Sequence, residues 1–352
     1  MEQAVEHQRL RMLHGIIDIR VGSVGQFRHP RTSSRSNICN VECVYAMVIA
    51  DDVCGVNDWR HSLSRPALAA LRGTRILDLL ASFPERRFTL TEVARATGVN
   101  PASCLAILGE LVQRGHLCRH ISRKTYWLGP ALIAAGTAAT IANPIVARAR
   151  TVAERLRGEL GLPTLLSTRV GDEIVCVFSL PDDAGRTAGL RAGERVPLVP
   201  PVGASFMAWV APDEVEAWIA LRPDDGAGPV VRQLRETLAL TRTRGFHVTL
   251  RRPEAEDIAS ILARAASGDL APDFYRQVVA FVATLDVEAS QPDMLDADAM
   301  YDTQLIASPI IDPETSGIYN LCLGGFPGPL AGTEIARLGQ RLTASCVEIM
   351  KH

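Results

Sequence analysis

Between residues 91 and 117, apolar positions recur at helical spacing on both sides of a short break. The first segment, Thr91 to Thr97, is followed by Gly98-Val99-Asn100. The second segment begins at Pro101, a residue favoured at the first helical position, and Asn100 is a suitable N-cap for it. Because its apolar residues are spaced three and four apart, one face is predicted to pack inward: Leu105, Leu108, Leu111 and Val112.

The opposite, N-terminal face of the second segment carries small or polar side chains. Small residues at the start of a helix let it enter a groove and turn its amide ends towards phosphates. Two short helices around a glycine turn are typical of a helix-turn-helix. The DNA-contacting residues predicted on this unit are Thr91, Asn100, Ala102, Ser103, Leu105 and Ala106.

The segments that flank this pair extend the pattern. Residues 117–128 predict two short strands around a polar turn at residues 122–124, and Arg119, Arg123 and Lys124 are placed to meet the DNA backbone. A helix with apolar positions is predicted ahead of the pair, from Pro66 to Ala81. Gly115 is predicted to end the second helix of the pair, the recognition helix. This order predicts a winged helix-turn-helix over residues 64–130, and the alternative is a generic small helical bundle with a hairpin.

The rest of the chain mixes both periodicities. Residues 131–161 are largely helical, with a break at Asn143-Pro144, and predict a linker helix that is also a place for dimer contact. The alternative is an ordinary amphipathic surface helix. Further on, strands and helices intermix, so we predict an α+β body with a mostly antiparallel sheet. The expected strands are 164–168, 173–180, 246–251, 305–312 and 318–324, and residues 189–199 are expected to form a strand, a Gly-Glu turn and a second short segment. The expected helices are 205–210, 212–221, 230–243, 253–266, 272–285 and 333–350.

Charge is distributed unevenly, although the net formal charge is only −2. Residues 64–130 hold ten Arg plus Lys against four Asp plus Glu, a balance of +6, whereas residues 131–352 hold 20 against 28, a balance of −8. A basic module joined to an acidic one fits a DNA-binding head on a body that does not bind DNA. Residues 1–60 hold seven of each, show no sustained period and predict a poorly defined extension.

Several classes of protein are disfavoured by the sequence. No apolar run approaches the roughly 20 residues needed to span a membrane, and the N-terminus lacks a signal pattern, so we expect a cytoplasmic protein. The eight cysteines form no paired framework, and the eight histidines show no metal-ligand spacing. We therefore expect no metal and no cofactor.

From residue 64 onward the chain resembles the IclR-type transcriptional regulators. The resemblance is carried by LTEVARATGVNPASCLAILGELVQRGHL in the head and by TYWLGPALIAAG at residues 125–136. In the body it is carried by LRAGERVPL (190–198), TRTRGFHV (241–248) and LIASPIIDPETSGIYNLCLGG (305–325). The family often has an arginine where this chain has Ala106. About fifty residues intervene here between the strands near Phe246 and Leu305, which predicts a variant effector domain with an insertion at about 253–302.

The resemblance implies a GAF-like effector-binding domain over residues 162–352 and a dimer or dimer of dimers in a bacterial cell. It implies control of transcription by a small organic or aromatic acid. Carried over by position, the effector pocket is floored by two strands and closed by a loop and helix start, whose free amides could meet a carboxylate. The implied ligand-binding residues are Gly203, Ala204, Ser205, Leu305, Ser308, Asn320, Cys322 and Gly324.

The leading hypothesis is therefore a ligand-responsive, DNA-binding regulator, either repressor or activator, that recognises a near-palindromic operator. One alternative is an enzyme on the same scaffold, with Cys176 or Cys322 as nucleophile, although neither has a histidine nearby in sequence. The other alternative is a protein-interaction module that has lost DNA binding, because Ala102 and Ala106 leave the recognition surface bland.

Overall fold

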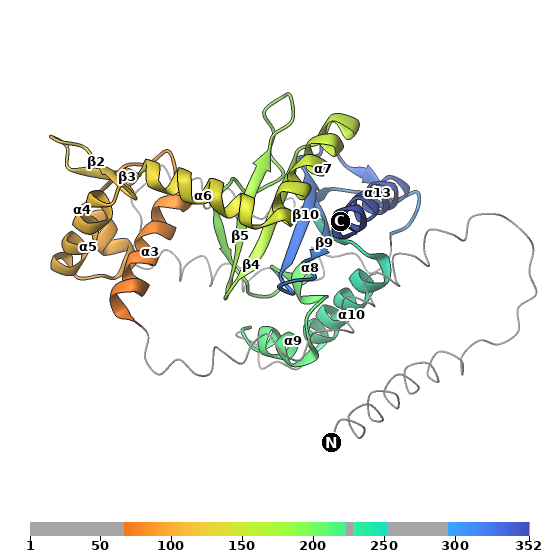
Figure 1. Cartoon of the computed structure of the whole chain (residues 1–352). Helices are drawn as coiled ribbons and strands as arrows, with labels where there is room; N and C mark the ends of the chain where they lie inside the picture. Colours follow the sequence, from red (N-terminus) through yellow and green to blue (C-terminus); the bar gives the residue numbers. More distant parts are fainter. Residues whose placement is uncertain (1–66, 223–227, 252–294, 352) are drawn as a thin grey trace, which may run out of the picture. The chain divides into compact units, whose positions relative to one another are not determined.

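The computed structural model describes residues 67–222, 228–251 and 295–351 (Figure 1). The expected N-terminal extension at residues 1–60 lies outside the described residues. So do the two helices expected at 253–266 and 272–285 and most of the expected insertion. Helices and strands carry the labels of Figure 1.

The winged head, residues 68–128, has the element order that the sequence predicts. Its helices are α3 (Leu68–Ser82), α4 (Leu90–Thr97) and α5 (Pro101–Gln113). The wing strands β2 (Leu117–Arg119) and β3 (Thr125–Leu128) pair in antiparallel fashion, and β1 (Phe88–Thr89), which the sequence analysis missed, adds a third strand in the order β1-β3-β2. One apolar core holds these elements together, with Ile76, Leu80, Phe88, Val93, Leu108, Leu117 and Tyr126 among its buried residues.

The inward face of α5 differs from the predicted one at one position. Cys104 and Leu108 are fully buried, whereas Leu105 is 53% exposed. The spacing of three and four fits Cys104, Leu108 and Leu111 as well as it fits the leucines alone, and a free cysteine packs as a small apolar residue. The prediction that Leu105 packs inward was therefore wrong.

The predicted linker is two helices. The first, α6 (Pro130–Ala142), has no buried residue, and its start is fixed to the head because Ala131 N donates to Gly115 O at 3.1 Å. The second, α7 (Pro144–Leu160), buries Ile145, Ala149, Val152 and Leu156 against the sheet body. The second half of the expected linker is thus part of the body's core.

Among the described residues, no single helix is both long and apolar enough to cross a membrane. Only the α6–α7 pair, bent by 92° at the break, passes that test of length and composition.

The sheet body, residues 144–350, is built on one antiparallel sheet of six strands in the order β6-β5-β4-β10-β9-β7. These strands are β4 (Thr164–Val170), β5 (Glu173–Leu180), β6 (Arg195–Pro197), β7 (His247–Leu250), β9 (Thr303–Ile311) and β10 (Ile318–Gly324). A separate pair joins β8 (Met300–Tyr301) to β11 (Leu330–Ala331). Segment 189–194, expected to include a strand, forms none.

Helices cover both faces of the sheet. On one face, α7 and α13 (Gly332–Met350) lie side by side (Figure 1). The apolar stripe of α13, at the helical spacing of the expected helix 333–350, is buried there: Ile335, Leu338, Leu342, Cys346 and Ile349. The other face carries α8 (Ala204–Met207), α9 (Pro212–Ile219) and α10 (Pro229–Arg244), which build a second core with Trp218 and Leu234. Central strands β9 and β10 are therefore buried on both sides.

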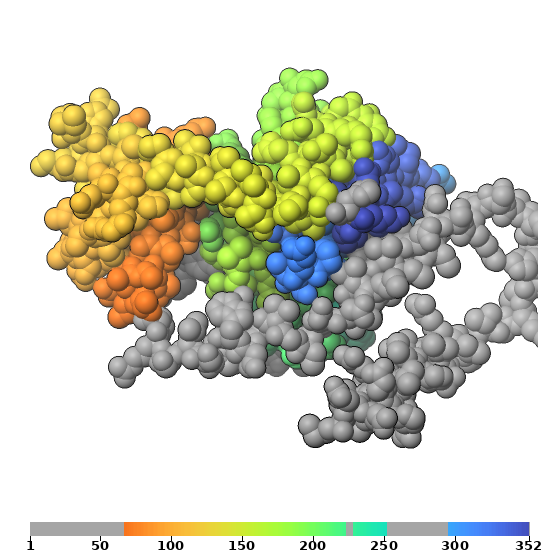
Figure 2. All heavy atoms as spheres, in the orientation of Figure 1, coloured from red at the N-terminus to blue at the C-terminus, as the bar shows by residue number. Residues whose placement is uncertain are grey.

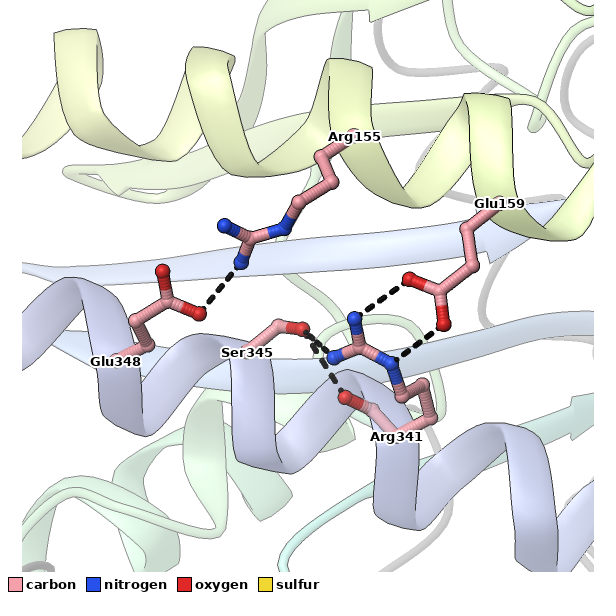
Figure 3. Close-up of polar contacts among 5 residues, drawn as sticks. All are labelled: Arg155, Glu159, Arg341, Ser345 and Glu348. Carbon is pink, nitrogen blue, oxygen red and sulfur yellow. Dashed lines mark hydrogen bonds and ion pairs between the residues drawn. The ribbon is translucent and has the colours of Figure 1, made fainter.

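Ion pairs align α7 with α13 at the edge of this core (Figure 3). The Arg341 guanidinium donates two hydrogen bonds, of 3.0 and 2.6 Å, to the two carboxylate oxygens of Glu159. It donates a third, of 2.6 Å, to Ser345 Oγ. Arg155 pairs with Glu348 about two turns further along α13. Exposed ion pairs of this kind stabilise a fold only weakly. The apolar core therefore provides most of the stability of this helix pair, and the ion pairs align the two helices.

Gly324 stands where two backbone segments meet. A Cβ built on it would lie 2.8 Å from Ala188 O and 2.9 Å from Ala188 Cα. The contact is with backbone, so no side-chain rotation can relieve it.

We expect Gly324→Ala to lower the free energy of unfolding of the sheet body by about 2 kcal/mol, the usual scale of overpacking. Gly158→Ala on α7 is the matched control, because its Cβ meets nothing within 4 Å and alanine favours a helix. Urea unfolding followed by fluorescence of the buried Trp209 and Trp218 measures both variants. An unchanged Gly324→Ala protein would refute the close contact.

His247 is a titratable side chain buried beside α10, and its Nδ1 lies 3.1 Å from Thr241 Oγ1. Burial, followed by the charge of Arg244, lowers the pKa of His247 to about 4. Because the unfolded chain binds this proton near pH 6.5, the stability it provides is complete above that pH and is lost as the pH falls towards 4.

Between pH 7 and pH 5 we expect the wild type to lose about 2 kcal/mol more unfolding free energy than His247→Asn. Asparagine keeps a polar atom near the position of Nδ1 but does not titrate, so it isolates the histidine from the carboxylates. Urea titrations at the two pH values provide the comparison. Equal pH dependence of the two proteins would show that His247 is not buried in its neutral form.

Candidate DNA interface and effector site

The helix-turn-helix begins at a capping box. Thr89 Oγ1 accepts a hydrogen bond from Glu92 N at 3.3 Å, and Glu92 Oε2 accepts one from Thr89 N at 2.7 Å. Thr89 is therefore the cap, and Thr91, a predicted DNA contact, is exposed on the first turn. Burial raises the pKa of Glu92, but hydrogen bonds from Thr89 and Arg86 outweigh it and hold the pKa below its ordinary value. The start of α4 is thus held by an ionised carboxylate.

The start of recognition helix α5 uses the polar side chains that the sequence offered as DNA contacts. Asn100 Oδ1 accepts from Ser103 N at 2.9 Å, and Asn100 Nδ2 donates to Ser103 Oγ at 3.0 Å. Both residues are thereby engaged with each other. The exposed residues on the following two turns are Ala102, Leu105, Ala106 and Gly109.

The wing ends in an ordered tip. His120 Nδ1 accepts from the backbone amides of Ser122 and Arg123, each at 3.2 Å, and Lys124 adopts a left-handed φ of 53°. This turn presents Arg123 and Lys124 to solvent, with Ile121 at 93% exposure between His120 and them. Figure 2 shows the wing, in amber, standing out from the helices of the head. Arg119 lies below the tip, with its guanidinium 5.8 Å from the centre of the Tyr126 ring.

Two arginines of the head were not singled out from the sequence. Arg95 is exposed in the last turn of α4, next to the turn that leads into α5. Arg87 stacks at 4.1 Å over the Trp127 ring and so ties the approach to β1 to the wing. The exposed position of Arg95 opposite the buried Val93 and Ala94 was readable from the helical period, whereas the stacking of Arg87 needed the fold.

In the sheet body, the face that carries α8 holds a cluster of small, apolar and sulfur side chains. Its members are Leu165, Cys176, Ala188, Ala307 and Cys322, with Leu190 and Leu305 packed against them. Asn320 adjoins this cluster two residues before Cys322 on β10. It is 1% exposed, and its Nδ2 donates to Ser205 Oγ at 2.9 Å. No described residue gives a hydrogen bond to Asn320 Oδ1.

Ser205, Leu305, Asn320 and Cys322 of the implied ligand-binding set therefore come together on one face. Ser308 does not join them, because its hydroxyl donates to Gly245 O at 2.9 Å and lies 3.2 Å from Thr343 Oγ1 of α13 on the other face. Alternation along β9 places neighbouring residues on opposite faces, so Ser308 lies opposite Ala307.

The glycines of the implied set have packing roles, and the helix start differs from expectation. Gly203 has φ 99°, and a Cβ there would lie 2.1 Å from Leu198 Cδ1, while Gly324 admits the backbone of Ala188. Helix α8 is a single turn from Ala204 to Met207 rather than 205–210, and the Ala204 and Phe206 amides donate to Pro201 O and Gly203 O. The helix start therefore offers fewer free amides than the sequence suggested.

Burial makes the two cysteines poor nucleophiles. Burial, followed by the charge of Glu194, raises the pKa of Cys176 to about 12. Burial also raises the pKa of Cys322. The thiolate is the reactive form, so both thiols are held in their inert state. Among the described residues, no group of three or more His, Cys, Asp or Glu side chains could hold a metal ion.

Comparison with known proteins identifies the head of the chain. Residues 69–119 match the IclR helix-turn-helix domain. The comparison with curated protein sequences gave no match.

Solved structures of similar fold span nearly the whole of their own chains. An IclR transcriptional regulator from Alicyclobacillus acidocaldarius matches with a TM-score of 0.58 at 19% identity, covering 82% of this chain and 99% of that one. An IclR homologue from Microbacterium hydrocarbonoxydans, complexed with 4-hydroxybenzoate, gives 0.51 at 16% identity over 80% and 99%. An IclR family regulator from Brucella abortus gives 0.51 at 17% identity over 85% and 96%.

The structural matches establish a shared fold, and the helix-turn-helix match identifies the head. Together they confirm the α+β architecture expected from the sequence, with a winged helix-turn-helix followed by an antiparallel-sheet domain. In fold, the chain is similar to IclR-type transcriptional regulators, and its residues 69–119 match the IclR helix-turn-helix domain.

Proposed function

We propose that this regulator binds a near-palindromic operator in double-stranded DNA and responds to a small organic or aromatic acid. The observation that carries the DNA half of the proposal is the ordered, cationic wing tip beside an exposed recognition helix. Arg119, Arg123 and Lys124 neutralise phosphates there, which supplies affinity that depends on salt. Such a regulator acts in the cytoplasm of a bacterial cell.

A homodimer places two recognition helices one helical turn apart on the duplex, which is why the operator is expected to be a near-palindrome. Helix α6 supports this assembly as the contact between copies. It has no buried residue, and Ile133 and Ile141 are 74% and 76% exposed. Figure 2 shows this helix at the surface of the molecule. A dimer of dimers built through the effector domains remains part of the proposal.

The effector half of the proposal rests on the cluster around Asn320. Leu165, Ala307 and the two thiols offer apolar contacts to an aromatic ring. Asn320 Oδ1 can accept a hydrogen bond from a hydroxyl group, and the Ser205 hydroxyl can donate one to a carboxylate. The Microbacterium hydrocarbonoxydans protein of the same fold was crystallised with 4-hydroxybenzoate, an aromatic acid with one hydroxyl. We therefore place the effector on this face, with Ser205, Leu305, Asn320 and Cys322 as its contacts.

The two alternative functions have less support. An enzyme would need a reactive nucleophile, and burial raises the pKa of both Cys176 and Cys322. An interaction module without DNA binding would have no use for an ordered turn that presents two cations, Arg123 and Lys124, at the end of the wing. The only feature that favours such a module is the exposed face of α5, where Ala102 and Ala106 offer no hydrogen-bonding side chains.

Replacing Arg123 with alanine should weaken binding to operator and unrelated duplex by the same factor and lower the salt slope, −dlogK/dlog[salt], by about 0.9 per protomer. Arg232→Ala, an exposed arginine on α10, removes the same charge from the effector domain and is the control. Fluorescence anisotropy at several salt concentrations measures both. If Arg123→Ala keeps the wild-type slope, the wing does not contact phosphate.

Replacing Asn320 with alanine should weaken effector binding at least about tenfold, because it removes a buried acceptor and the partner of Ser205. Ser308→Ala is the matched control, since Ser308 is equally buried on the neighbouring strand but faces α13. Calorimetry with a panel of benzoates that begins with 4-hydroxybenzoate provides the affinities. Equal losses in both variants, or no binding of any benzoate by the wild type, would contradict the assignment.

A further inference from the structure

Leu105 is the one large apolar side chain that is exposed on α5. It is 53% exposed, whereas Cys104 and Leu108 on either side of it are fully buried. The exposed residues around it, Ala102 and Ala106, carry a single methyl group each. Of the exposed side chains at the start of α5, that of Leu105 therefore reaches furthest from the helix axis, towards a groove that holds this helix.

The polar groups of this part of the helix are committed elsewhere. Asn100 and Ser103 bond to each other through two hydrogen bonds of 2.9 and 3.0 Å. Residues 101–109, PASCLAILG, contain no Arg, Lys, Asn, Gln, Asp or Glu. The first such residue is Glu110, which pairs with Arg114 at 2.5 Å. Paired hydrogen bonds to guanine or adenine need those side chains, so this stretch cannot make them.

The major groove offers one apolar feature, the 5-methyl group of thymine. We infer that Leu105 reads thymine methyl groups, so that the sequence specificity of this regulator rests on an apolar contact rather than on hydrogen bonds to base edges. The wing cations provide affinity without sequence information, which leaves selection among bases to α5. The inference rests on the proposed DNA-binding function and names the chemistry by which that function selects its site.

The test removes methyl groups one at a time. An operator is first selected from a random pool of duplex DNA with the full-length protein. Each thymine is then replaced by deoxyuridine, which lacks only the 5-methyl group, and affinity is measured by fluorescence anisotropy. We expect the wild type to lose about fourfold in affinity at one or two thymines per half-site, as burial of one methyl group predicts.

Leu105→Ala should bind the thymine operator more weakly and should no longer distinguish thymine from deoxyuridine at those positions, a non-additive pair of changes. Leu68→Ala, on α3 with 58% exposure, makes the same change at a matched surface site and should keep the distinction.

Several results would overturn the inference. A wild type insensitive to every deoxyuridine, or a Leu105→Ala protein that keeps the thymine preference, removes its basis. A changed molar mass of Leu105→Ala by sedimentation would assign Leu105 to a contact between copies. If no duplex is enriched at all, the proposed function fails and the inference falls with it, whereas selective binding without a methyl effect overturns the inference alone.

Discussion

The sheet body depends on burial of its central strands on both faces. Strands β9 and β10 lie between α7 and α13 on one side and α8 on the other, so any polar side chain on them needs a partner within the protein. Ser308 meets this need through Gly245 O and α13, and Asn320 meets half of it through Ser205. The remaining acceptor, Asn320 Oδ1, is the feature that sets the proposed effector face apart from the opposite one. Packing therefore decides where a ligand can contribute hydrogen bonds.

The head differs from the sheet body in how its polar side chains are used. Its polar side chains are used on its own backbone: Thr89 and Glu92 cap α4, Asn100 caps α5, and His120 closes the wing tip. Order at these points lowers the entropy lost on binding. Because these polar side chains bond within the head, the exposed face of α5 is mostly apolar. In the proposed complex, the wing therefore supplies charge and α5 supplies sequence specificity.

Much of this arrangement could be predicted from the sequence, because period and caps act locally. The α4–α5 pair, the wing and the stripe of α13 follow from spacing, and Gly115 and Pro101 mark their ends. Leu105 was misplaced because two overlapping apolar stripes fit α5, and only the packing of Cys104 chooses between them. Ser308 could not be placed because every other residue of LIASPII is apolar, as in a strand buried on both faces, so no alternation shows which face a residue takes.

The most direct test of the account is binding of genomic DNA fragments by the purified full-length protein at two salt concentrations. A regulator with a cationic wing and a reading helix should retain a small, reproducible set of fragments at the higher salt, where contacts to phosphate alone have weakened. Those fragments should share a near-palindromic element with half-sites about one helical turn apart. Retention that falls equally for all fragments, with no shared element, would contradict the account.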